Sequence, residues 1–557
     1  MISIHNYKQR ARNNSGTGAL TDLSGARNRA PLAGAITAAA ALGEPEGFDF
    51  WVDEILWTQG KVAVELMEEV LEAIGGRRVG GPAKLPKALR GGGERQSTPS
   101  AAPSSAADSA RGAADVAAAL VLRLGLGGGR GGTASGSGGG VSEEAATAQA
   151  GGVREDDAQL GYRHVPEWQF LWTKSIYGIK AARTMRPGQV VSAIAGLNSL
   201  TMKKRMIQTL KTSLGLEAAG QVAPVSFCLP EELPQWRQWL QQHPELDTGK
   251  LGPGGQPRAP RTRPSPVPSA LQAAAIPPTH PGRPHTHLKV AQLYVTNPLL
   301  LHDRKFHLRL WVLVTGHRPL RAYMHTRGLV LFSSQPYEPD RPLAAGVRPS
   351  ASHVTNYARN EDTWVWGLER LAAHFDEAFG PAAWPALWRE MRRRAAAGVA
   401  AALPSLQAAH AWLRPRLEGY GFQMVGLDFL IDERMAPWLL EFNSAPSIMA
   451  VHRDPEVHAL IKENKVAMLS DVAAMVMHRV DDAAGDGAEG GGRRPAARPR
   501  RRVAAEWRRD VEHEMARRGG FEPLMGAFPY ECAGIPWQEE DKQLRGLWEE
   551  RGWPWAA

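Results

Sequence analysis

Hydrophobic and polar positions divide the chain into segments with a period and segments without one. Apolar residues at helical spacing over residues 47–74 predict one amphipathic helix. A short strand in SFCLP is expected to end at Pro230, and residues 289–480 then combine strand-like and helical periods in one block. A last helix is expected over residues 503–518. Strand-like and helical segments are thus mixed along the chain.

Between these segments the chain is rich in Gly, Ala, Ser and Pro and has no period. The predicted organisation is therefore as follows: residues 1–160 are mostly disordered apart from the helix over 47–74, residues 161–250 form an N-terminal lobe, residues 251–288 are a Pro/Gly-rich segment, residues 289–480 form the core, residues 481–502 are a basic linker, and residues 503–557 are a helical tail.

The segment GFQMVGLDFLIDERMAPWLLEFNSAPS has two apolar runs around a short polar break. This pattern predicts an antiparallel hairpin. A turn centred on Arg434 and Met435 places Asp428 directly opposite Glu441. Because side chains alternate along a strand, Asn443 shares the face of Glu441.

The same register pairs Leu430 with Leu439, so apolar side chains flank the two acids. Carboxylates that face each other across a ladder repel, and a shared proton, solvation or a cation would relieve the repulsion. Asp428, Glu441 and Asn443 offer the oxygen ligands that Mg²⁺ prefers. The alternative is a solvent-facing edge with two ordinary acids. The nearly continuous apolar runs favour the metal, because unpaired charge is costly in a buried sheet.

The strand DRKFHLRLWVLV alternates, with cations on one of its faces. Lys305, His307 and Arg309 point to one side together with Trp311, and Phe306, Leu308, Leu310 and Val312 point to the other. A row of cations suits a phosphate or a substrate carboxylate, which Arg309 can bind in bidentate fashion. A solvated strand face is the alternative, and the neighbouring carboxylate hairpin favours the binding site.

The segment HVTNYARNED precedes a helical pattern that starts near Trp366. Side-chain oxygens of Thr355 and Asn356, with free backbone N–H groups at the helix start, can hold a phosphate or a ribose hydroxyl. A plain helix cap is the alternative. His353 is expected to be structural rather than catalytic.

Composition narrows the classes of partner. The 557 residues carry a formal charge of +9, which favours an acidic partner such as nucleic acid, an anionic membrane or an acidic protein tail. The basic run RRPAARPRRR comes with no nucleic-acid-binding motif, so no nucleic acid is expected. No apolar run approaches bilayer length, so no membrane span is expected. Two cysteines allow no disulfide framework or cysteine-based zinc site, which fits a reducing compartment.

Three segments resemble the tubulin tyrosine ligase-like family in order and spacing: AQLYVTNPLLLHDRKFHLRLWVLV, SHVTNYARNED and GLDFLIDERMAPWLLEFNSAPS. SAIAGLNSLTMKKRMIQTL resembles its N-terminal segment, and RRGGFEPLM resembles a motif found after its core. The resemblance implies an α+β, ATP-grasp-like fold that holds ATP and Mg²⁺ between two lobes.

The resemblance also implies roles for single residues. It implies Mg²⁺ ligation by Asp428, Glu441 and Asn443, ATP contacts for Gln292, Tyr294, Thr355 and Asn356, and catalytic roles for Lys305 and Arg309. Arg309 would face the γ-phosphate or the reacting carboxylate, and Gln292 would lie at the adenine hinge.

The implied reaction transfers the γ-phosphoryl group to a carboxylate, and the amine of a free amino acid then attacks the acylphosphate. The implied substrate is the acidic tail of tubulin in microtubules, which gives the net positive charge a use. Glutamate is the expected amino acid because most of the family are glutamylases, with glycine and tyrosine as alternatives. The expectation is a monomer that acts in the cytoplasm on the cytoskeleton, with the cilium and basal body as candidate places.

The chain departs from the family before the strand that carries Gln292. The family normally has a W-I-x-K-P segment there, whose Lys contacts the nucleotide phosphates, followed by a Gly-rich loop. Residues 251–288 have neither, and Lys250 and Lys289 only flank the gap. Leu293 stands where a hinge Lys is usual. Two hypotheses follow: a faulty gene record of an active ligase, or a degenerate member that binds microtubules without catalysis.

Overall fold

The computed structural model describes residues 2–5, 48–52, 65–79, 168–173, 175–182, 185, 189–243, 290–338, 352–353, 355, 363–411, 419, 421–480, 500–525 and 534–553. Within them helices and strands are mixed, which confirms the predicted α+β class. The Pro/Gly-rich segment 251–288 and residues 481–499 of the predicted linker lie outside the described residues.

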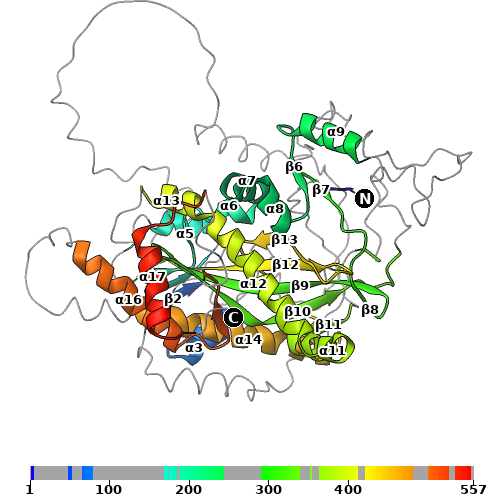
Figure 1. Ribbon diagram of the computed structural model, residues 1–557. Coiled ribbons are helices and arrows are strands. Elements are labelled where there is room, and N and C mark those ends of the chain that lie inside the picture. The colour runs from blue at the N-terminus through cyan, green and yellow to red at the C-terminus, as the bar shows by residue number, and fades with distance from the viewer. Residues whose placement is uncertain are drawn as a thin grey trace, which may run out of the picture. The chain divides into compact units, whose positions relative to one another are not determined.

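An antiparallel seven-stranded sheet forms the centre of the fold (Figure 1). Its strands in spatial order are β11 (Val365–Gly367), β10 (Leu320–Phe332), β9 (Arg304–His317), β12 (Gln423–Ile431) and β13 (Pro437–Asn443), with β8 (Leu300–Leu301) beside β9 and β14 (Phe521–Pro523) beside β10. The two long strands β9 and β10 therefore lie in its middle, where both of their faces can be covered.

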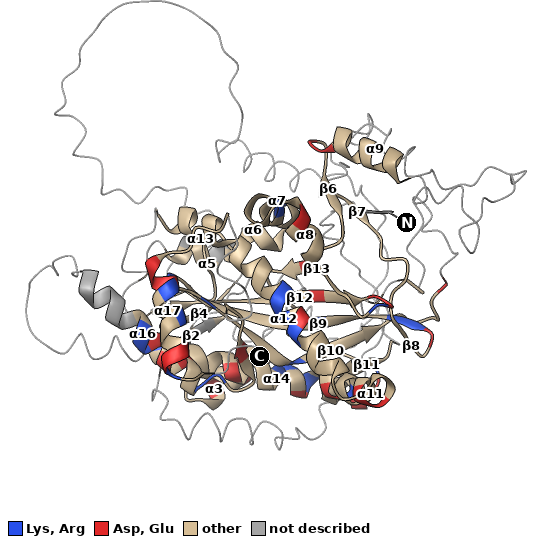
Figure 2. Ribbon diagram, in the orientation of Figure 1, with Lys and Arg blue, Asp and Glu red and all other residues tan. Residues whose placement is uncertain are grey.

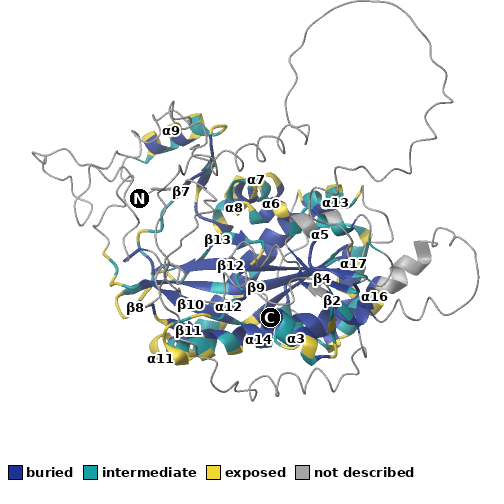
Figure 3. Ribbon diagram, turned by 180° about the vertical axis from the view of Figure 1, so that it is seen from behind, coloured by how far each residue is buried: buried dark blue, intermediate teal, exposed yellow. Residues whose placement is uncertain are grey.

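Strand β9 shows why the sheet is buried on both faces. Phe306 and Leu308 point into the apolar core that includes residues of α12 (Ala383–Ala401), whereas Trp311 and Leu313 point into the core that includes residues of α14 (Pro455–Val476). The predicted alternation of this strand is thus confirmed. Figure 3 shows the central strands as buried, with exposed residues on outer helices such as α9 and α11. A sheet covered on both faces needs nearly continuous apolar strands, as these sequences are.

Helix α12 packs unusually close to strand β13, and Gly398 is the reason. A Cβ atom at Gly398 would lie 2.7 Å from the ring of Phe442, closer than real side chains approach. The absence of a side chain at Gly398 therefore lets the helix backbone lie on the strand that carries Glu441.

The other helices lie around this centre, except α9, which lies apart from it (Figure 1). They are α3 (Glu65–Ala73), α5 (Ser175–Ala182), α6 (Asn198–Thr201), α7 (Lys203–Leu214), α8 (Leu216–Val222), α9 (Leu233–Gln242), α11 (Leu368–Phe379), α13 (Leu403–His410), α16 (Arg500–Ala516) and α17 (Glu539–Glu550). No helix among the described residues is long and apolar enough to cross a bilayer.

Two smaller sheets complete the strands. An antiparallel sheet has the order β1 (Ile2–His5), β7 (Val290–Leu293) and β6 (Ser226–Cys228), so the strand expected in SFCLP is confirmed. A parallel sheet has the order β3 (Arg77–Arg78), β2 (Asp49–Val52), β4 (Phe170–Trp172) and β5 (Val190–Val191).

Strand β2 corrects the prediction of a single helix over residues 47–74. Among the described residues of this range, α3 is helical and β2 is a strand, because Phe50 and Val52 follow the two-residue period of a strand and are fully buried. The parallel pairing of β2 with β4 also joins residues before 160 to the predicted N-terminal lobe.

The C-terminal residues were predicted as a helical tail, and the helices are present, but this part of the chain is not an appendage. Strand β14 pairs with β10 in the central sheet, and Trp507 and Val511 of α16 lie in its core. Figure 2 shows the central strands mostly without charge. One buried charged side chain that contacts these strands is Glu514, which anchors α16.

Glu514 is completely buried, and its polar partners come from β9, β10 and the segment that follows α14. Its carboxylate lies 2.7 Å from Nη2 of Arg479 and 3.2 Å from Nε of Arg321. It also accepts hydrogen bonds from the hydroxyls of Tyr323, at 2.7 Å, and Thr315, at 3.0 Å. The two guanidinium groups balance its charge, so removing one partner would leave the others unpaired in the core.

We therefore expect Glu514→Gln to lower the free energy of unfolding by about 3 to 5 kcal/mol, because it removes the anion shared by buried Arg479 and Arg321 and leaves Arg321 with Asp510 alone. Urea unfolding of the full chain measures this. Glu512→Gln is the matched control on the same helix, since Glu512 is exposed and its ion pair with Arg551 is at the surface. Equal losses in the two variants would contradict a special role for the buried cluster.

Candidate active site

Two carboxylates face each other on the hairpin of β12 and β13. Asp428 pairs directly with Glu441, as predicted. Nδ2 of Asn443 lies 3.3 Å from Glu441 Oε1 and 3.5 Å from Asp428 Oδ2, so the three side chains share one face. The hairpin therefore brings together the three residues expected to bind Mg²⁺.

The register beyond the carboxylates differs from the prediction. The turn has three residues instead of two, and Met435 at its end takes a left-handed conformation with φ of 62°. Leu430 consequently pairs with Trp438, and the predicted pair of Leu430 with Leu439 is wrong. A bulge at Leu440 then shifts the ladder by one residue and restores the predicted pairing of the two acids.

Arg309 adds a cation to this pair from the next strand. It is the direct neighbour of Asp428 across β9 and β12, so Arg309, Asp428 and Glu441 form one row over three strands. Its Nε donates to Oδ1 of Asp428 at 2.5 Å and its Nη2 donates to Oδ2 at 3.0 Å. Burial would raise the pKa of Asp428, but Arg309 and His307 hold this pKa at about 2. The cation expected to face phosphate is thus held by Asp428.

Glu441 has the opposite electrostatic situation. Its burial and the neighbouring charge of Asp428 raise its pKa to about 7. A proton and a divalent cation are two solutions to the same repulsion, so the raised pKa marks a place where a cation would be favourable.

Lys203, at the first position of α7, also faces the carboxylates. Burial lowers its pKa, and the charges of Glu441 and Asp428 oppose this shift. The side chain is half-buried, and it makes no hydrogen bond or ion pair with another described residue. Sequence reasoning missed Lys203, because α7 is far from the hairpin in the chain and the run KKR gives no sign of which lysine points inward.

The predicted cationic row on β9 is not a solvated face. Nζ of Lys305 donates to the hydroxyl of Tyr294 at 2.8 Å and lies 4.5 Å from the centre of its ring. Burial lowers the pKa of Lys305 to about 8. The Tyr294 hydroxyl lies 2.8 Å from Nδ1 of His353, and Nε2 of His353 lies 3.1 Å from the carbonyl oxygen of Glu338. His353 is therefore a bridge between segments, in line with the structural role expected for it.

His307 lies between these two cations on β9 and contacts Thr355. Its Nδ1 is 2.6 Å from the Thr355 hydroxyl. Burial lowers the pKa of His307 to about 4 against the attraction of Asp428, so the ring is neutral at pH 7. Strand β11 separates Thr355 from α11, which starts at Leu368, so the alternative of a plain cap on that helix does not apply to Thr355. Asn356 lies outside the described residues.

Gln292 lies on β7, which belongs to the small antiparallel sheet. Its Nε2 donates to the hydroxyl of Ser226 on β6 at 2.9 Å. Gln292 thus ties two strands together, and its role at an adenine hinge stays a prediction.

A second lysine near the row was also missed by sequence reasoning. Lys465 of α14 is buried, and its Nζ donates to the carbonyl oxygen of Met449 at 2.5 Å. Burial and the charge of Arg309 lower its pKa to about 7. Its position inside a long helix, within ENKVAML, gave no signal of proximity to the hairpin.

The residues of the hairpin fit a hard divalent cation. Two carboxylates and an amide supply oxygen donors, and Asp428 retains lone pairs beside its contacts with Arg309. Among the described residues no three His, Cys, Asp or Glu side chains are grouped as a metal site. A cation here would therefore depend on Asn443 and on oxygens from a ligand, which is how Mg²⁺ is held beside phosphates.

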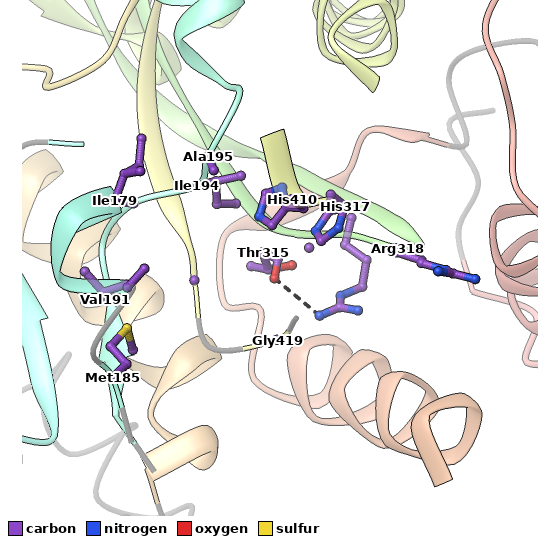
Figure 4. Close-up of a pocket in the computed structure, with 15 residues that line it drawn as sticks. Ile179, Met185, Val191, Ile194, Ala195, Thr315, His317, Arg318, His410 and Gly419 are labelled. Carbon is purple, nitrogen blue, oxygen red and sulfur yellow. Dashed lines mark hydrogen bonds between the residues drawn. The ribbon is translucent and has the colours of Figure 1, made fainter. Parts of the chain in front are cut away.

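Two pockets of the described residues lie elsewhere, and neither is lined by the carboxylate pair. The first is a narrow one at the end of β9 (Figure 4). His317 and His410 lie side by side in it, with ring centres 3.6 Å apart and planes 18° apart. Burial lowers the pKa of both histidines, and that of His317 falls to about 3 with further lowering by His410, Arg321 and Arg318.

Comparison with known proteins agrees with this arrangement. The family model described as the tubulin-tyrosine ligase family matches residues 182–473, more than half of the chain. The chain is 25% identical over 347 residues to tubulin polyglutamylase ttll6 of Danio rerio, an alignment that covers 58% of this chain and 41% of that protein. It is 24% identical over 344 residues to tubulin polyglutamylase TTLL6 of Homo sapiens, covering 58% of this chain and 36% of that protein.

A shorter alignment has a higher sequence identity. Over 164 residues the chain is 31% identical to probable tubulin polyglutamylase ttll-9 of Caenorhabditis elegans, covering 29% of this chain and 37% of that protein. The chain spans about two fifths of the length of the curated relatives it matches.

The histidine pair gives a prediction for stability against pH. A histidine whose pKa is lowered by folding stabilises the fold above its ordinary pKa, and this stability is lost as the pH falls through that value. From about pH 7.5 to about pH 5.5 we expect wild-type protein to lose about 1 kcal/mol more unfolding free energy than His317→Phe. The variant keeps a stacked ring without a titrating group. Urea unfolding at both pH values measures this, and equal losses would contradict the prediction.

Proposed function

The chain belongs to the tubulin-tyrosine ligase family, and we propose that it is an ATP- and Mg²⁺-dependent ligase that adds glutamate to the acidic tail of tubulin. The observation that carries this proposal is the row of Arg309, Asp428 and Glu441, with further cations around it. The proposed reaction proceeds through an acylphosphate, formed when the γ-phosphoryl group of ATP passes to the acceptor carboxylate.

The charges of the site support a polyphosphate ligand. Lys203 and Arg309 face the two carboxylates, the charge of Arg309 reaches Lys465, and Lys305 lies on the same face of β9 as Arg309. These four cations exceed Asp428 and Glu441 by two positive charges when all six groups are ionised. A divalent cation bound to the acids would increase this surplus. A nucleoside triphosphate is a ligand with enough negative charge to balance it, and its phosphates can also complete the coordination of the cation.

The carboxylates would bind the metal ion, and the Lys and Arg side chains would bind the nucleotide. In this proposal Asp428, Glu441 and Asn443 bind Mg²⁺, which neutralises charge on the β- and γ-phosphates. Arg309, fixed by Asp428 in a defined orientation, directs its guanidinium edge towards the γ-phosphate or the reacting carboxylate. Positioning and charge neutralisation are what phosphoryl transfer mainly requires of a protein.

Lys203 supports the proposal in a chain that lacks the family's usual Lys segment before β7. Its ammonium makes no ion pair with another described residue, although it faces the carboxylate pair. Burial disfavours its charge, and a phosphate ligand would restore that charge by direct contact. We assign Lys203 to the phosphates, which lets nucleotide binding proceed without the missing segment.

The other predicted residues would hold the rest of the nucleotide. Lys305 is fixed by Tyr294, and His307 is joined to Thr355, so each pair forms a rigid polar group on the same face of β9. Neutral His307 can donate or accept a hydrogen bond without adding charge. These contacts suit the sugar and the α-phosphate, next to the carboxylate row.

Our proposals for the acceptor protein and for the added amino acid are based on the relatives. Those compared are named polyglutamylases, so glutamate is the amino acid we propose. An acidic tubulin tail suits a chain with a formal charge of +9. The place of action that follows is the microtubule cytoskeleton of the cytoplasm, where we propose that the protein acts as a monomer.

Nucleotide binding can be tested with adjacent lysines. Lys203→Met should weaken binding of Mg·ATP by roughly tenfold or more, because it removes a phosphate contact in a partly desolvated site. Lys204→Met is the matched control, since Lys204 points to Glu231 and to the carbonyl oxygen of Leu229. Isothermal titration calorimetry of the full chain measures both affinities. A weakening common to both variants would remove Lys203 from the site.

The ligase activity is tested by incubating the full chain with tubulin, Mg·ATP and labelled glutamate, glycine or tyrosine. We expect label from glutamate on tubulin, and loss of at least about a hundredfold in rate for Asp428→Asn, because the metal site loses a carboxylate. If the wild-type chain incorporates none of the three amino acids, the ligase proposal is wrong. Co-sedimentation with microtubules without nucleotide binding would then support the degenerate family member.

A further inference from the structure

A groove open to solvent lies between α5, the segment before α6, α7 and α13, apart from the carboxylate row. It encloses about 1130 Å³, part of which is open solvent. Its polar lining residues are Asn198, Ser199, Arg205, Gln208, Thr209 and Ser405. None of the described residues that line it is acidic, and none is aromatic.

The groove lies across helix α7 from the active site. At 100° per residue, Arg205, Gln208 and Thr209 share one face of the helix, and Lys203 lies on the opposite face. Arg205 is exposed and makes no hydrogen bond or ion pair with another described residue. A helix is about 10 Å wide with its side chains, so the groove and the carboxylate row are separate but neighbouring places.

Charge is segregated in the chain around the groove. Residues 168–216, which include α5, α6 and α7, contain eight Lys or Arg and no Asp or Glu. Residues 391–417, which include α13, contain no Asp or Glu either. The whole chain is nearly balanced, with 66 basic and 57 acidic residues, so this separation is local. Figure 2 accordingly shows α6 and α13 without acidic residues. Lys204 and Lys211 are paired with Glu231 and Glu232, whereas Arg205, which lines the groove, has no such partner among the described residues. The groove itself therefore attracts an anionic partner.

The lining also suits a peptide backbone. The amides of Asn198 and Gln208 can donate to and accept from main-chain groups. Gly196, Ala408 and Ala409 have small or no side chains, which leaves room for a chain to approach closely. A single-stranded nucleic acid would want aromatic side chains for base stacking, and the described lining offers none.

We propose that this groove binds an extended acidic peptide, and that it holds the tail of the protein substrate at a second place beside the active site. That the peptide is the tail of the substrate rests on the proposed function, whereas its extended, acidic character is inferred from the residues that line the groove. A tail anchored by Arg205 would raise the effective concentration of its remaining carboxylates at the row of Arg309, Asp428 and Glu441.

The test is fluorescence anisotropy with a labelled glutamate-rich peptide of about ten residues and the full chain at low salt. Arg205→Glu should weaken binding by about fivefold or more, because it reverses the charge inside the groove. Arg545→Glu is the control, since Arg545 is exposed on α17 and the variant has the same net charge. It should change binding by less than about twofold. Equal weakening by both variants, or no binding by wild type, would overturn the proposal.

Two further measurements keep this proposal separate from the ligase proposal. An oligonucleotide that competes with the peptide and depends more strongly on Arg205 would assign the groove to nucleic acid, against the proposal. Mg·ATP affinity is measured on the same samples and should be unchanged in Arg205→Glu. A wild-type chain that binds the peptide through Arg205 but not Mg·ATP contradicts the ligase alone. A chain that binds Mg·ATP, with peptide binding indifferent to Arg205, contradicts the groove alone.

Discussion

The opposition of Asp428 and Glu441 inside a covered sheet is the constraint on which the site depends. Two acids at paired positions repel, and burial on both faces of the sheet strengthens the repulsion. Arg309, next in the same row, balances the charge of Asp428. The pKa of Glu441 is raised, which shows that the repulsion between the two acids is only partly balanced. A further positive charge would therefore stabilise ionised Glu441, and in a metal-dependent ligase the bound metal ion would supply it.

Several features of the fold serve this row. Gly426 precedes Asp428 by two residues, and a Cβ there would lie 3.3 Å from Cδ of Arg309, so the missing side chain leaves room for the arginine. Gly398 lets α12 lie directly on β13, as the close approach to Phe442 shows. Packing therefore fixes the backbone of the row, while the side chains of Arg309 and Glu441 stay half-buried.

Local periodicity predicted much of this from the sequence. Alternation along β9 identified the faces of Lys305 and Arg309, and the two apolar runs identified the opposition of the acids. The predicted register held there only because two departures cancel: the turn is one residue longer than assumed, and the bulge at Leu440 compensates. Neither departure is visible in apolar spacing, since a left-handed Met435 has no side-chain signature comparable to glycine.

What sequence patterns missed depends on contacts between distant segments. Lys203 lies more than two hundred residues from the hairpin it faces, and Glu514 anchors a helix that composition alone marked as a tail. The bidentate pairing of Arg309 with Asp428 was also missed, because alternation gives the face of a side chain but not its partner.

The position of Lys203 bears on the departure of this chain from its family. A phosphate site needs positive charge at a defined place, and it does not require that the charge come from one particular segment. Lys203 comes from a helix that packs into the core through Met206, Ile207 and Leu210, so its backbone is fixed before any ligand binds. A lysine on a flexible loop would lose more conformational freedom on binding the same phosphate. A preorganised cation, Lys203, already faces the carboxylates. The absence of the usual lysine segment is therefore weaker evidence against catalysis than it is when the sequence is considered alone.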